Sequence, residues 1–67
     1  MEKSAEEVLK YLIGYLELCL DELCEAEEND FVYGEKTAYV ECLEIIQTWS
    51  KAKSSGLDYD IEKKYPL

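Results

Sequence analysis

The sequence predicts an all-α fold, an antiparallel helical hairpin with a short C-terminal tail, which dimerises into a four-helix bundle. Three observations predict it. Apolar residues recur every three or four positions over two long stretches, the turn-forming pair Asn29-Asp30 separates these stretches, and the apolar side of the first stretch is too wide for one facing helix. The 67 residues allow a single domain. A core of this size rarely supplies more than about 3–5 kcal/mol, which favours its completion by a second copy.

The first helix is expected over about residues 4–28. Ser4 and Glu7 have the spacing of a capping box, in which the Ser4 hydroxyl accepts from the Glu7 amide and the Glu7 side chain reaches back to Ser4. The apolar positions that follow keep helical spacing throughout: Ala5, Val8, Leu12, Tyr15, Cys19, Leu23 and Ala26, with Leu9, Ile13, Leu16 and Leu20 beside them.

The second helix is expected over about residues 31–53. Its inner stripe is predicted from the same spacing and consists of Phe31, Ala38, Cys42, Ile45, Trp49 and Ala52, flanked by Tyr39 and Ile46. Gly56 followed by Leu57 predicts a Schellman-type stop. The tail, residues 57–67, is too apolar to remain free, so we expect it to fold back on the hairpin, with Asp58 or Asp60 capping a short turn.

The apolar arc of the first helix covers roughly 240°, whereas a helix that lies on one partner needs only somewhat more than 100°. One facing helix and a short tail leave part of this arc bare, and soluble monomers expose little contiguous apolar surface. We therefore expect a homo-oligomer, with a two-fold dimer as the first choice. The residues assigned to self-association lie at the two edges of the arc: Tyr11, Tyr15 and Leu18 at one, and Leu9, Ile13 and Leu20 at the other.

Charge is distributed unevenly along the chain. Residues 1–35 hold eleven carboxylates and two lysines, and residues 36–67 hold five of each, so the formal net charge of −9 belongs to the first half. Nucleic acid and anionic membranes are disfavoured as direct partners, because both require a basic footprint, and a basic protein surface is favoured. An acidic stripe along the first helix is the candidate partner-binding site or a merely solubilising face, and consists of Glu17, Asp21, Glu25 and Glu28.

The three cysteines, Cys19, Cys24 and Cys42, are expected to be free thiols in a cytoplasmic protein, because their number is odd and the acidic N-terminus is unlike a secretion signal. We interpret them as small buried apolar residues, since a zinc site would lack a fourth soft ligand. No apolar run approaches the roughly 20 residues that span a bilayer. Without histidine there is no ordinary general base, and no enzyme activity, catalytic residue, metal or cofactor is predicted.

The segments YGEKTAYVECLEIIQ (33–47), GLDYDIE (56–62) and KYPL (64–67) resemble, in overall pattern, short acidic helical proteins carried by phages and integrative elements of Gram-positive bacteria. This group has no assigned catalytic or binding residues, so the resemblance implies none here. What it implies is context, since short acidic proteins of such elements often block host defences by occupying nucleic-acid-binding surfaces.

The leading hypothesis is a non-enzymatic interaction module that binds a basic protein surface. Its sharpest form is an inhibitor of a host nucleic-acid-targeting defence enzyme, of the anti-CRISPR or anti-restriction type. Two alternatives remain open. One is a small-ligand sponge, with a pocket between subunits formed by Tyr33, Lys36 and the tail, and the other is a purely structural assembly subunit of a mobile element.

Overall fold

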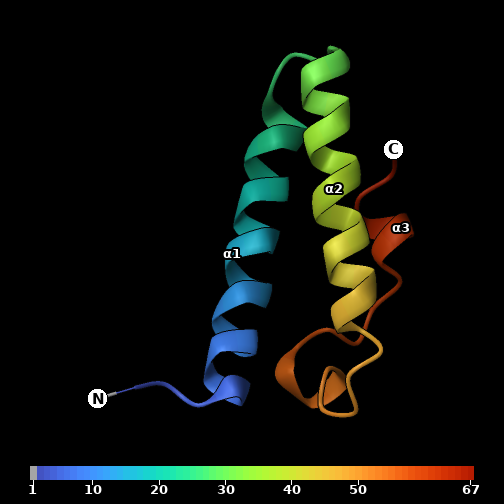
Figure 1. Cartoon of the computed structure of the whole chain (residues 1–67). Coiled ribbons are helices and arrows are strands. Elements are labelled where there is room, and N and C mark those ends of the chain that lie inside the picture. The colour runs from blue at the N-terminus through green and yellow to red at the C-terminus, as the bar shows by residue number, and fades with distance from the viewer. Residues whose placement is uncertain (1) are drawn as a thin grey trace.

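The computed structural model describes residues 2–67 and is all-helical. Two long helices, α1 (Ala5–Glu25) and α2 (Asp30–Ile46), lie side by side and antiparallel (Figure 1). The chain then makes a short 3-10 helix, η1 (Lys53–Ser55), turns back, and forms the one-turn helix α3 (Ile61–Lys64) beside α2. The predicted helical hairpin with a C-terminal tail is confirmed. The Cα atoms extend 39 × 27 × 15 Å, so the molecule is elongated.

Side-chain caps define the start of each α-helix. The Ser4 hydroxyl accepts from the Glu7 amide at 3.2 Å and also donates to the Glu7 carboxylate, so half of the predicted capping box forms. Asn29 Oδ1 accepts from the Val32 amide at 2.9 Å and begins α2. Asp60 caps α3 by accepting from Lys63. These caps satisfy amide groups that have no partner within the helix.

The second helix ends earlier than the sequence predicts, at Ile46 rather than near residue 53. The Thr48 hydroxyl donates to the Ile45 carbonyl at 2.6 Å, and the Trp49 amide turns to Ile46 instead of continuing the α-helical pattern. Local hydroxyl-to-carbonyl bonds of this kind compete with the helix. The Gln47 side chain then donates to the backbone of the returning tail, 2.8 Å from the Tyr59 carbonyl.

Gly56 ends the turn region with the predicted Schellman motif. Its φ is 100°, its amide donates to Lys53, and the Leu57 amide donates to the Ala52 carbonyl at 3.0 Å. Leu57 is then fully buried, together with Ile61 and Tyr65, so the tail folds back as expected. The core forms where the two helices and this tail meet, and consists of Ile13, Leu16, Leu20, Val40, Leu43, Ile46, Ala52, Leu57, Ile61 and Tyr65.

The predicted inner stripe of the second helix is wrong at Phe31, Ala38, Cys42 and Ile45. Its other members are confirmed, because Ala52 and Ile46 are buried and Trp49 and Tyr39 pack against the core. Phe31 is 73% exposed and Ile45 is 69% exposed, and Ala38 and Cys42 also lie at the surface. The buried stripe is instead Val32, Lys36, Val40, Leu43 and Ile46. The tail packs against one side of α2, and this rotates the helix so that the Val40 and Leu43 side lies between α1 and the tail.

The cysteines are also not the buried apolar residues that the sequence suggested. Cys24 and Cys42 are exposed and Cys19 is only partly buried. None of the helices in the described part of the chain is long and apolar enough to cross a membrane.

Candidate interaction surface

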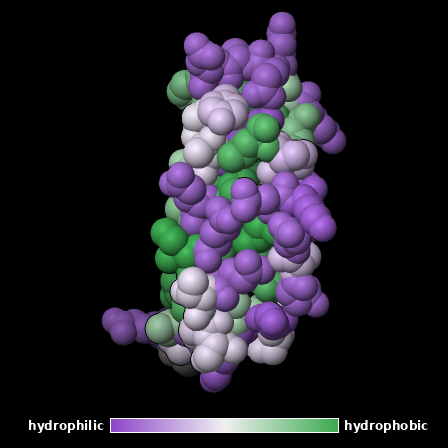
Figure 2. Space-filling model, turned by 90° about the vertical axis from the view of Figure 1, so that its right-hand side faces the viewer, coloured by the Kyte–Doolittle hydropathy of each residue, from purple (hydrophilic) through white to green (hydrophobic). Residues whose placement is uncertain are grey.

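The tail covers one side of the hairpin and leaves the other side with a large set of exposed apolar side chains, which we call the open face. Seen from the side that carries α3, hydrophilic groups cover most of the surface, with smaller hydrophobic patches between them (Figure 2). The open face receives side chains from both long helices: Val8, Tyr11, Leu12, Tyr15 and Leu18 from α1, and Phe31, Cys42 and Ile45 from α2.

Side chains of α1 and α2 influence one another's pKa values beside the open face. The Cys19 thiol, followed by Tyr39 of α2, raises the pKa of Tyr15 in α1. The Glu35 carboxylate raises the pKa of Tyr39, and the Cys19 and Cys42 thiols add to this. Side chains from α1 and α2 therefore lie within interaction distance of one another across the open face.

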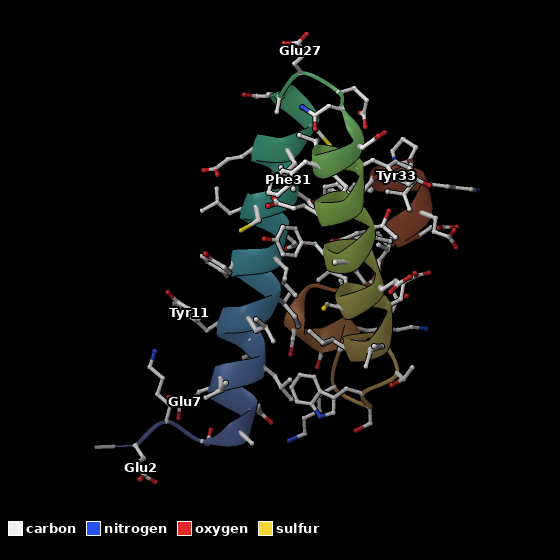
Figure 3. The ribbon with its side chains drawn as sticks, turned by 45° about the horizontal axis from the view of Figure 1, so that its top comes forward. Glu2, Glu7, Tyr11, Glu27, Phe31 and Tyr33 are labelled. Atoms are coloured by element: carbon white, nitrogen blue, oxygen red, sulfur yellow. The ribbon has the colours of Figure 1, made fainter. Side chains whose placement is uncertain are left out.

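A surface hollow of about 330 Å³ lies along α1 and is lined by Lys10, Tyr11, Gly14, Tyr15 and Leu18. Figure 3 shows Tyr11 projecting from the side of α1 that faces away from α2, and Phe31 and Tyr33 leaving α2 on different sides. The hollow is thus an outward extension of the open face, and its floor is the one position in this part of α1 without a side chain.

The six residues assigned to self-association separate into two groups. Ile13 and Leu20 are buried and Leu9 is half-buried in the core of the single chain, so none of these three is an open contact residue. Tyr11, Tyr15 and Leu18 are exposed on the open face. The edge of the arc that carries Leu9, Ile13 and Leu20 is covered by α2, which leaves the opposite edge uncovered.

The acidic stripe is only partly a free surface. Glu17 accepts a hydrogen bond of 2.5 Å from the Tyr59 hydroxyl, and burial together with this bond raises the pKa of Tyr59. Glu28 lies 2.8 Å from the ammonium of Lys36. Asp21 and Glu25 are exposed. Two members of the stripe therefore hold the fold, and two are available to a partner.

Lys36, which the sponge hypothesis places in a pocket between subunits, is buried in the single chain and paired with Glu28. The residue is only 8% exposed, and the hydrogen bond that its ammonium donates to the Glu28 carboxylate raises the pKa of that ammonium. Tyr33, three residues earlier in α2, is exposed. Lys36 sits one helical turn from Val32 and from Val40, and this spacing was the signal in the sequence that could have identified it as an inward residue.

Charge differs between the two ends of the hairpin. The end that carries both the start of α1 and the residues after α2 holds Lys3, Lys10, Lys51 and Lys53, and Lys51 and Lys10 both pair with Glu6, at 2.6 and 3.5 Å. The loop end, marked by Glu27 in Figure 3, holds one lysine against seven carboxylates: Asp21, Glu22, Glu25, Glu27, Glu28, Asp30 and Glu35. The negative field of the protein is therefore concentrated at the loop end.

Within residues 2–67 there is no group of three or more side chains placed to hold a metal ion. Comparison of the chain with protein-family models, with curated proteins and with solved structures gave no match. The functional conclusion therefore depends on the geometry and charge of the open face and of the loop end.

Proposed function

We propose that the protein is a non-enzymatic interaction module that self-associates through its open face into a dimeric four-helix bundle and binds a basic protein surface through its acidic loop end. The observation that carries the proposal is the open face itself. Aromatic and aliphatic side chains from both helices are exposed on the side of the hairpin that the tail does not cover. Contiguous apolar surface of this kind marks protein–protein contact in water-exposed proteins.

A second hairpin would cover apolar side chains that are exposed in the single chain. A second hairpin that packs against the uncovered side of α1 brings four long helices together, as in a four-helix bundle. The exposed aromatics, with Tyr11 66% and Phe31 73% exposed, are the residue types that anchor protein interfaces.

The partner surface follows from the free carboxylates. Because Glu17 and Glu28 are bound within the chain, the contacts to a basic protein come chiefly from Asp21, Glu25 and their neighbours near the loop. A dense acidic surface attracts the lysine- and arginine-rich surfaces with which proteins bind nucleic acid. A host nucleic-acid-targeting defence enzyme is the partner class that this chemistry fits.

Analytical ultracentrifugation tests the self-association, and we expect a dimer for the wild type and a monomer for Leu18→Glu. A pull-down from host lysate tests the acidic surface. Asp21→Lys with Glu25→Lys is expected to lose the captured protein. The matched control, Asp58→Lys with Glu41→Lys, changes two exposed acids elsewhere by the same charge and is expected to retain it. Equal capture by both double variants would refute the role of the loop end.

A further inference from the structure

Gly14 is a residue that the single chain does not need. It lies in the middle of α1, where glycine is less favourable than alanine. A Cβ built at this position meets no described atom within 4 Å, so no close approach inside the chain requires glycine. Its φ is not in the positive region, which only Gly56 occupies among the described glycines. Neither packing nor backbone conformation within one copy therefore accounts for it.

Gly14 lines the hollow of about 330 Å³, together with Lys10, Tyr11, Tyr15 and Leu18. In packed helices, a gap of this kind receives a side chain of the facing helix. The three large apolar residues around it, Tyr11, Tyr15 and Leu18, are exposed. One strip of α1 therefore carries both a hollow and side chains large enough to enter the same hollow on another copy.

We infer that the occupant is a second copy of this chain, with the two α1 helices antiparallel and crossing at Gly14. The inference rests on the proposed self-association and adds its geometry. A two-fold axis between Gly14 and Tyr15 places Tyr15 of each copy opposite Gly14 of the other. The same axis places Tyr11 opposite Leu18, so every member of the strip meets a complementary one, as a two-fold interface requires.

Charge selects the antiparallel direction. Residues 2–14 hold three carboxylates and two lysines, and Glu6 is already paired with Lys51. Residues 15–28 hold six carboxylates and no lysine. A parallel dimer sets two halves of net charge −6 against each other, whereas an antiparallel dimer sets each of them against a half of net charge −1. Like charges at an interface disfavour the first arrangement strongly.

The hollow is tested by filling it. Gly14→Gln puts a polar side chain into the hollow, and Gly34→Gln is its control, because Gly34 is also an exposed glycine within a helix whose Cβ would meet no described atom. Both changes raise helix propensity to the same degree, and circular dichroism verifies the fold. By sedimentation equilibrium, we expect Gly14→Gln to raise the dimer dissociation constant at least about tenfold, and Gly34→Gln to change it less than about threefold.

The direction is tested with spin labels on the exposed native Cys24, after Cys19→Ala and Cys42→Ala. Antiparallel helices that cross at Gly14 hold the two labelled positions about 30 Å apart, and parallel helices hold them about 10 Å apart. Pulsed electron–electron double resonance measures the longer distance, and dipolar broadening of the continuous-wave spectrum reports the shorter one.

If the wild type is a dimer and Gly14→Gln dimerises with the same affinity, or if the Cys24 labels show the short distance, this geometry is wrong and the proposed self-association still holds. A monomeric wild type overturns both. If that monomer instead bound a synthetic amphipathic helix rich in lysine and leucine, the occupant of the open face would be a basic partner helix and not a second copy.

Discussion

Replacing Tyr59 by phenylalanine removes a single hydroxyl and tests how the tail is held against α1. The Tyr59 hydroxyl donates to the Glu17 carboxylate at 2.5 Å. A hydrogen bond to a charged group contributes about 1.5–3 kcal/mol when it is well buried. Glu17 is only half-buried, so water replaces part of the lost bond, and we expect a loss of about 1 kcal/mol. For a domain of this size that lowers the melting temperature by about 4–8 °C.

The loss is measured by thermal and urea unfolding, followed by circular dichroism and by the fluorescence of Trp49. All variants are compared at one protein concentration, because association shifts the apparent stability. Tyr33→Phe is the matched control, since that ring is exposed. Glu17→Gln and the double variant complete a cycle in which we expect a coupling of about 1 kcal/mol. If Tyr59→Phe unfolds as the control does, or if the two changes simply add, this bond does not hold the tail.

Three further changes probe other contacts. Lys36→Leu is expected to leave the free energy of unfolding in urea equal or higher, because the Glu28 side chain is 60% exposed and returns to water. Glu28→Gln is expected to lower it, because the inward ammonium of Lys36 loses its partner, and equal losses in the two variants would contradict this. Gly56→Ala is expected to cost about 1–2 kcal/mol in thermal unfolding, because its φ of 100° disfavours any side chain, and an unchanged melting temperature would contradict the assigned turn. Burial, and then the neighbouring Glu62, raise the pKa of Glu44, so the folded chain holds this proton more tightly than the unfolded chain. The proton on Glu44 therefore stabilises the fold fully below the pKa of the unfolded chain, and this stabilisation is lost as the pH rises through the pKa of the folded chain. Glu62→Gln should be more stable than the wild type at about pH 7 and should gain less stability on acidification. Parallel curves of unfolding free energy against pH for the two proteins would refute this.

The parts of the fold that depend on neighbouring residues were predictable. The cap at Ser4, the break at Asn29 and the Gly56-Leu57 stop all act over three to five residues, and the structure has each of them. The return of the tail was predictable for a different reason. Leu57, like the other apolar residues after it, would otherwise be exposed to water, and it is fully buried.

The rotation of α2 could not be read from its own periodicity, because the helix carries two apolar stripes. The stripe through Phe31 and Ile45 contains no lysine, whereas the stripe through Val40 and Leu43 contains Lys36. The tail favours the second stripe by covering it, and Glu28 then neutralises the lysine within it. Both contacts depend on groups well outside the stripe, and the helical period carries no information about them. The same rotation turned the first stripe outward and made the open face.

The open face links stability to assembly, and this gives a last prediction. If each hairpin completes its core against a second copy, folding and association are coupled, and unfolding must depend on protein concentration. A hundredfold increase in concentration stabilises a dimer by about 2.7 kcal/mol, which for two chains of 67 residues raises the melting temperature by about 10 °C. Leu18→Glu places a carboxylate on the open face and leaves the core untouched, so its melting temperature should stay constant over the same range. A wild type that shows the same constancy would mean that the single hairpin is stable with its apolar side exposed.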